Sequence, residues 1–123
     1  MADGDERVPA GVLRWPRDPS ASRLALHIGA ARLTFHLHGN DSLKGKRQVS
    51  RSLIAKLRGR FNMAAAEVDG MDRHQTLVIG ITCVSNRPGH ADEMIDAALH
   101  FVEGHRIGAE LVDVERSVID GVS

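Results

Sequence analysis

The sequence predicts a small α+β domain with four strands and two helices in the order β-α-β-β-α-β. Apolar and polar residues alternate along three segments, which is the two-residue period of a strand with one buried face, and the short segment MAAAEV is interpreted as a fourth strand. Along two longer segments apolar residues recur every three or four positions, which is the period of an amphipathic helix. Glycine, asparagine and proline stand between the segments, where turns are expected.

The first strand is expected over residues 24–38 and the first helix over residues 43–61. Strict alternation marks the second half of the strand, and Gly39 then ends it. Ser42 has the side chain of a good N-cap for the helix. The apolar positions of the helix fall on one broad face: Leu43, Val49, Leu53, Ile54, Leu57 and Phe61. This face is expected to cover the sheet.

The second half of the chain is expected to hold the other three strands and the second helix. Asp69-Gly70 is a strong signal for the turn of a hairpin. The two strands of the hairpin, a second helix and a last strand are expected over residues 63–68, 75–84, 90–104 and 109–119. Cys83 has the apolar phase of its strand and is expected in the core. Two helices on one face of a four-stranded antiparallel sheet make the ferredoxin-like fold.

Residues 23–123 are expected to form this single domain, after a flexible tail over residues 1–22 that holds three prolines and no periodicity. No apolar run reaches the ~18 residues of a membrane span, and the start of the chain lacks the apolar core of a signal peptide. The single cysteine excludes an internal disulfide and a cysteine-based metal or redox site. The chain is therefore expected in the cytoplasm, without a cofactor.

Charge is distributed unevenly along a chain whose 16 basic and 16 acidic residues cancel. Residues 42–61 hold seven cations and no acid, whereas residues 62–123 hold four basic and eleven acidic residues. The seven cations are Lys44, Lys46, Arg47, Arg51, Lys56, Arg58 and Arg60. A helix that needed charge only for solubility would mix both signs. Cations at a helix N-terminus also oppose the helix dipole, so this arrangement suggests an anionic partner outside the helix.

At about 100° per residue, these cations lie on different sides of the helix. One exposed flank carries Lys44, Arg47, Arg51 and Arg58. Lys56 and Arg60 lie on the opposite flank, and Lys46 points toward the apolar side, where it is expected to extend its ammonium group back to solvent. A line of such groups suits successive phosphates of a nucleic acid backbone. With no tyrosine and few other aromatic residues, stacking on bases is not expected.

Three stretches resemble a known bacterial family: SLKGKRQVSRSLIAKLRGRFN in the first helix, AEVDGMDRHQ and GITCVSN. Over about Leu24 to Ile119 the chain is similar to the YlxP-like family, a domain of unknown function. The resemblance implies a ferredoxin-like fold in the cytoplasm. Genes of the family usually lie among those for translation initiation and small-subunit ribosome maturation, which implies an RNA or ribosomal partner. His74 stands where members often have tryptophan, so no role of that ring is carried over.

The favoured interpretation is a non-enzymatic factor that binds RNA or a ribosomal particle through the first helix. A small metal-assisted enzyme is an alternative, because the hairpin holds Glu67, Asp69, Asp72 and His74 within eight positions. Carboxylates beside a histidine can bind a divalent ion or transfer protons. A polar turn is the simpler interpretation of these four residues, so an enzyme is the less favoured hypothesis.

Two further expectations concern histidines and partners. His36 and His38 share one strand face with His27 near, but no third and fourth metal ligand is evident, so exposed polar residues are expected rather than a metal site. A third hypothesis is a protein–protein adaptor, in which the basic helix meets an acidic protein surface or the acidic half of a second copy of the chain. The strand edges of this fold can also pair two copies of the chain, so a homodimer is a further expectation.

Overall fold

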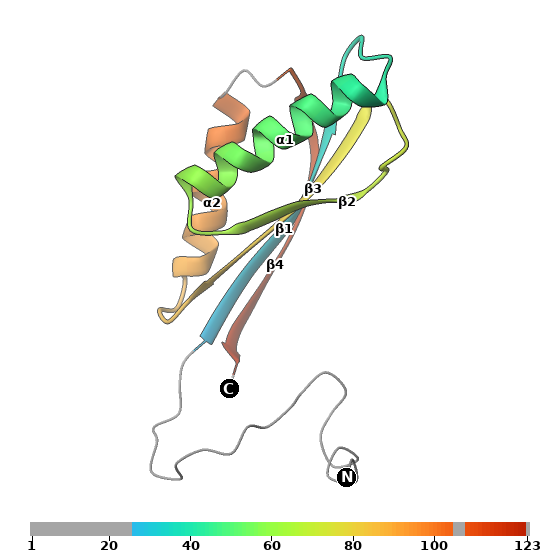
Figure 1. Cartoon of the computed structure of the whole chain (residues 1–123). Coiled ribbons are helices and arrows are strands. Elements are labelled where there is room, and N and C mark those ends of the chain that lie inside the picture. Colours follow the sequence, from blue (N-terminus) through green and yellow to red (C-terminus); the bar gives the residue numbers. More distant parts are fainter. Residues whose placement is uncertain (1–25, 105–107, 123) are drawn as a thin grey trace, which may run out of the picture.

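The computed structural model describes residues 26–104 and 108–122, with side chains up to residue 119. They form β1 (Leu26–His36), α1 (Leu43–Arg60), β2 (Ala64–Asp69), β3 (Thr76–Ser85), α2 (His90–Gly104) and β4 (Glu110–Val122) (Figure 1). The predicted order is confirmed, and the element boundaries agree to within a few residues. The expected tail over residues 1–22 lies outside the described residues. Neither described helix has the length and apolar character needed to cross a membrane.

The four strands form one antiparallel sheet in the order β2-β3-β1-β4. Both helices pack on the same face, since α1 contacts Glu67 of β2 and α2 contacts Cys83 of β3. Glu67 stands opposite Ile79, and Ile79 and Cys83 point to the same side of β3 because side chains alternate along a strand. This arrangement is the ferredoxin-like α+β fold that the sequence predicts.

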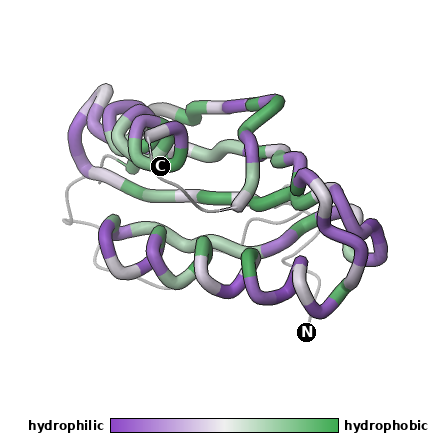
Figure 2. Tube along the Cα trace, turned by 90° about the horizontal axis from the view of Figure 1, so that it is seen from above, coloured by the Kyte–Doolittle hydropathy of each residue, from purple (hydrophilic) through white to green (hydrophobic). Residues whose placement is uncertain are grey.

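The hydrophobic core lies between the sheet and the helices. Leu33, Phe35 and Leu37 are buried, as their alternation predicts. The buried residues of β3 on the same side are Leu77, Ile79, Ile81 and Cys83. Figure 2 shows hydrophobic residues along the central strands and hydrophilic residues in the loops beyond one end of the sheet.

The start of α1 is defined by a side-chain cap. The hydroxyl of Ser42 accepts a hydrogen bond from the backbone N–H of Gly45 at 3.0 Å, as expected of an N-cap. The helix then runs to Arg60 and buries one face against the sheet, made of Lys46, Ser50, Leu53 and Leu57. Three of these four side chains are small or apolar, and the fourth is a cation.

The second helix lies close against the two strands beside it. A Cβ atom on Gly29 of β1 would stand 2.9 Å from the carbonyl oxygen of Ala91, so only glycine permits this approach without a shift. Arg116 of β4 donates to Asp96 at 2.7 Å and also binds Asp92. The pKa of Arg116 is raised, chiefly by the hydrogen bond to Asp96. These two acids of α2 are therefore paired with β4 and do not neutralise the cations of α1.

Candidate nucleic-acid interface

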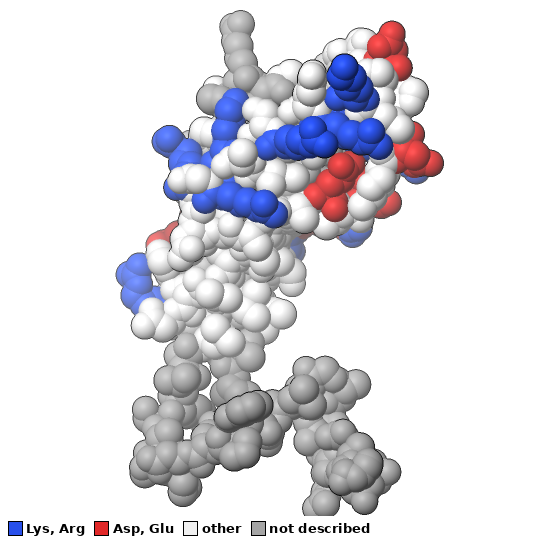
Figure 3. All heavy atoms as spheres, viewed as in Figure 1, with Lys and Arg blue, Asp and Glu red and all other residues white. Residues whose placement is uncertain are grey.

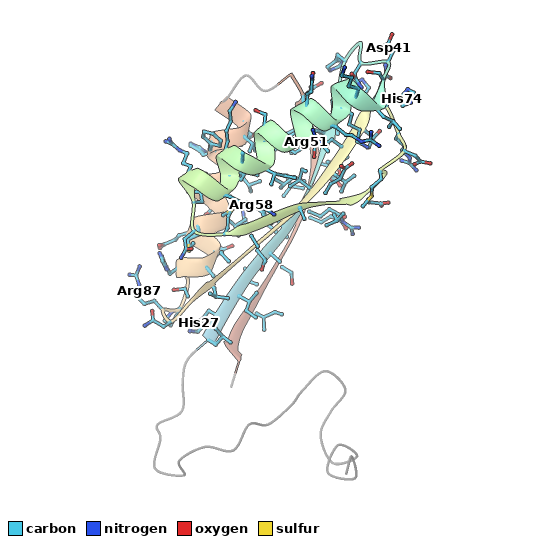
Figure 4. All side chains as sticks on the ribbon, viewed as in Figure 1. His27, Asp41, Arg51, Arg58, His74 and Arg87 are labelled. Carbon is cyan, nitrogen blue, oxygen red and sulfur yellow. The ribbon has the colours of Figure 1, made fainter. Side chains whose placement is uncertain are left out.

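Three cations of α1 project freely into solvent. Lys44, Arg47 and Arg51 are exposed, and none of them forms an ion pair or a side-chain hydrogen bond with another residue of the described part of the chain. Figure 3 shows lysine and arginine side chains gathered over α1, and Figure 4 labels Arg51 beside this helix. These three residues, called here the free cations, lie on the flank that the helical wheel predicts.

Arg58 and Arg60 are exposed but anchored at the far end of α1. A terminal nitrogen of Arg58, Nη2, donates to the backbone carbonyl of Ala65 in β2 at 2.8 Å. The guanidinium carbon of Arg60 lies 5.0 Å from the ring centre of Phe101, which is a cation–π contact between the two helices. An arginine has five N–H donors, so both retain groups that can reach an anion. Lys56, which was also expected at the interface, is half-buried.

Lys46 occupies a different environment from the other six cations. Its side chain is 1% exposed, and its ammonium nitrogen Nζ lies 2.9 Å from Oε2 of Glu67 and donates to the carbonyl of Gly70. At 2.9 Å the two charged groups form an ion pair, although their orientation does not meet hydrogen-bond geometry. The expectation that Lys46 extends back to solvent is wrong. The carboxylate and the carbonyl replace water, so the ammonium group stays inside and cannot contact a phosphate.

The free cations are unfavourable for the helix itself. The first turn of α1 contains no acid that would offset the positive end of the helix dipole, and Lys44 and Arg47 lie close to that end. Glu67, the acid of β2 nearest to the buried face of α1, is already paired with Lys46. In Figure 3 acidic side chains border the basic surface at the loop end of the helix, so the positive surface has a defined edge.

The hairpin residues do not form one site. Glu67 faces α1, whereas the Asp69 carboxylate accepts a hydrogen bond from the backbone N–H of Gly70 at 2.7 Å. Asp72 and His74 are exposed and line a shallow hollow between the hairpin and the loop before α1. Within the described residues no group of three or more histidine, cysteine, aspartate or glutamate side chains could hold a metal ion.

The histidines of β1 also lie apart. His27 is buried on the helix side of the sheet, whereas His36 has the opposite phase and lies at the other end of the strand. The expectation that His27 lies near the other two is therefore wrong, because eight residues of extended chain lie between it and His36. The rings of His36 and His38 are 4.3 Å apart, and Nε2 of His38 lies 2.6 Å from a carboxylate oxygen of Glu110.

Cys83 lies in the core, as its position in the strand pattern predicts. The side chain is buried, and Sγ donates to the carbonyl of Ala91 at 3.4 Å. Burial raises the pKa of the Cys83 thiol, while a backbone hydrogen bond with Gly29 opposes the rise. A thiol that is buried and protonated is a poor nucleophile. The described environment is that of a structural residue.

Sequence patterns alone did not reveal the partner of Lys46. Its position on the wheel marks it as inward-facing, but Glu67 belongs to β2, and no local pattern links residues of two separate segments. The usable signal is a lysine in the middle of an otherwise apolar helix face, because such a group must find an opposite charge to be buried.

The family model described as a protein of unknown function, DUF503, matches residues 28–116. The matched range runs from β1 into β4, so it includes α1 and the whole hairpin. A search of curated proteins found no match.

Proposed function

The chain belongs to the DUF503 family of proteins of unknown function, and we propose that it is a non-enzymatic factor that binds RNA or a ribosomal particle through α1. The contacts are made by the free cations Lys44, Arg47 and Arg51, with Arg58 and Arg60 extending the surface along the helix. Binding is to the phosphate backbone, and the factor acts in the cytoplasm.

The observation that carries this proposal is the contrast between Lys46 and the free cations. Lys46 is neutralised by Glu67 within the fold, whereas Lys44, Arg47 and Arg51 meet no acid in the described part of the chain. Local stability gives no reason for two cations near the helix N-terminus, because they oppose the dipole. An anion supplied by a partner offsets this cost.

The spacing of the cations suits a nucleic acid strand. At a rise of about 1.5 Å per residue, Lys44 and Arg51 lie about 10 Å apart along the helix axis, and Arg58 lies about 10 Å further on. One strand of a duplex presents a phosphate about every 3.4 Å along its axis, so about three to six phosphates lie within this length. A row of cations on a rigid helix can therefore follow one backbone.

Base-specific readout is not part of the proposal. Single-strand readers of RNA stack bases on aromatic side chains of an exposed sheet face. Here Phe35 is buried in the core. The rings of Phe61 and Phe101 pack against each other, with their centres 5.7 Å apart. The resemblance to the YlxP-like family, with its association with ribosome maturation genes, favours a structured RNA or a small-subunit particle as the partner.

Co-sedimentation with ribosomal particles tests the proposal. The double variant Arg47→Glu/Arg51→Glu should lose co-sedimentation at low salt, while the control Arg73→Glu/Arg87→Glu, which changes the net charge equally and also alters exposed arginines, should retain it. If about three to four phosphates are contacted, the slope of log affinity against log salt should lie between about −2 for a single strand and about −4 for a duplex. Affinity should then fall about twentyfold to 150-fold between 50 and 200 mM salt.

Two results would contradict this function. Co-sedimentation that does not change with salt, or that survives the Arg47→Glu/Arg51→Glu change, would place the contact elsewhere. Binding that is lost for RNA but retained for an acidic protein would favour the adaptor hypothesis, because the same helix would then meet carboxylates instead of phosphates.

A further inference from the structure

The sheet face away from the helices carries a hollow in its surface. The hollow measures about 730 Å³, and its floor is made of the small residues Ala64 and Ala66 of β2 with Gly80 and Thr82 of β3. Two long side chains, Arg32 of β1 and Glu115 of β4, stand along its side and are called here the ridge. None of these six residues belongs to α1, but Arg58 at the end of its basic surface also lines the hollow.

One row of the sheet shows how the hollow and the ridge are related. The strand registers align Ala66 with Gly80, Gly80 with Arg32, and Arg32 with Glu115. In the order β2-β3-β1-β4, this row therefore has two small residues followed by two residues with long side chains. A two-fold axis that runs along the strands between the two central strands, β3 and β1, turns the row end for end. It places the ridge of each copy over the hollow of the other, which is the self-complementarity that a symmetric dimer requires.

Large apolar side chains also lie exposed on this face. Val68, Val84 and Ile119 are large hydrophobic side chains on this face, and about half of each is exposed. In the row that contains Ile28, the sheet registers align Val84 and Ile119 on either side of it. The same axis brings Ile28 of one copy onto Val84 of the other. Exposed apolar side chains at both ends of the face, with the small residues of the hollow between them, favour an interaction site.

The charges of this face suit a second copy better than a nucleic acid. Nη2 of Arg32 lies 2.9 Å from Oε1 of Glu115, so the ridge enters the opposing hollow as a neutral pair. The chain has 16 basic and 16 acidic residues, so two copies meet without net repulsion. Four strands at about 4.8 Å spacing and about eight residues of ~3.3 Å each give a face of ~500 Å², close to the area that a modest protein interface buries on each side.

We propose that this face is a homodimer interface, formed by two copies that pack sheet against sheet about a two-fold axis between β1 and β3. The two α1 helices then lie on the outer layers, so their free cations remain exposed. The free cations take no part in the dimer, and Arg58 is the residue named for RNA binding that also borders the hollow. The dimer differs from pairing through strand edges because the edges β2 and β4 stay unpaired. Face-to-face packing of two sheets at about 10 Å is a common arrangement.

Sedimentation velocity of the full chain over a concentration series tests the interface. The wild-type chain should change from monomer to dimer in the micromolar range. The variant Ala66→Glu puts a carboxylate in the hollow opposite Glu115 of the partner subunit, and it should weaken dimerisation at least tenfold. The matched control Ala97→Glu introduces the same side chain at an exposed alanine of α2 and should leave dimerisation unchanged.

A compensating change separates this geometry from a general disturbance of the sheet. In the double variant Ala66→Glu/Glu115→Arg, the axis brings opposite charges together, so dimerisation should recover toward the wild-type value. A wild-type chain that stays monomeric at every concentration would overturn the proposal and leave residues 1–25 or another protein as the occupant of this face. A dimer that ignores Ala66→Glu, or that the second change does not restore, would also overturn it.

Discussion

Replacing Lys46 by methionine should destabilise the domain, although methionine fits an apolar helix face. The change keeps the length of the side chain but removes the cation from a buried ion pair, so Glu67, which is 19% exposed, loses its partner. Removal of one member of a buried pair typically costs about 3–5 kcal/mol. Because Glu67 retains some contact with water, we expect about 2–4 kcal/mol here, which lowers Tm by about 10–25 °C for a domain of this size.

Chemical denaturation followed by circular dichroism measures this cost. The double variant Lys46→Met/Glu67→Gln removes both charges and should lie within about 1 kcal/mol of the wild type, because no buried carboxylate is then left without a partner. Lys44→Met is the control, since Lys44 is exposed two residues earlier in the same helix and its loss should cost less than about 0.5 kcal/mol.

The same variants separate stability from binding. Lys44→Met should weaken association with RNA or ribosomal particles without unfolding the domain, and Lys46→Met, at a temperature where it remains folded, should bind as the wild type does. If Lys46→Met were as stable as Lys44→Met, the buried pair would contribute nothing to the fold, and the reason for separating Lys46 from the free cations would be lost.

Two more predictions concern groups outside the basic surface. Burial raises the pKa of the Cys83 thiol, so less thiolate is present at pH 8 in the native chain than in the unfolded chain. A thiol reagent at pH 8 should therefore modify the native chain at least a hundredfold more slowly than the unfolded chain. Equal rates would show that Cys83 is accessible. The triple change Asp69→Asn, Asp72→Asn and His74→Gln should leave co-sedimentation with ribosomal particles intact, and loss of a cellular function with binding retained would instead favour the enzyme hypothesis.

The helices and strands could be predicted because their signals are local. Ser42 marks the start of α1, and the alternation of Leu33, Phe35 and Leu37 marks the buried face of β1, through residues that are neighbours in the chain. The flank that carries Lys44, Arg47 and Arg51 follows from the helical period in the same way. For these features the sequence needs no knowledge of what the element packs against.

The candidate site could be predicted only in part. The wheel gives the direction in which Lys46 points, but the carboxylate that neutralises it lies in β2 and reaches it through packing of α1 on the sheet. The four hairpin residues are close in sequence, yet Glu67 turns toward α1 while Asp72 and His74 face a hollow on the loop side. Closeness in sequence did not become a common site, because Glu67 lies within β2, whereas Asp72 and His74 lie in the loop between β2 and β3.

Local patterns in the chain therefore predict the order of the elements, the face that each one buries and the concentration of positive charge on the first helix. Packing of α1 on the sheet sets which of those charges remain available, since Lys46 is neutralised by Glu67 and Lys44 is not. The tertiary structure also produced the hollow of Ala66 and Gly80 beside the ridge of Arg32 and Glu115, a row drawn from four strands. The physical reason is that period and capping act within one segment, whereas ion pairs and surface shape depend on strand order and register between segments.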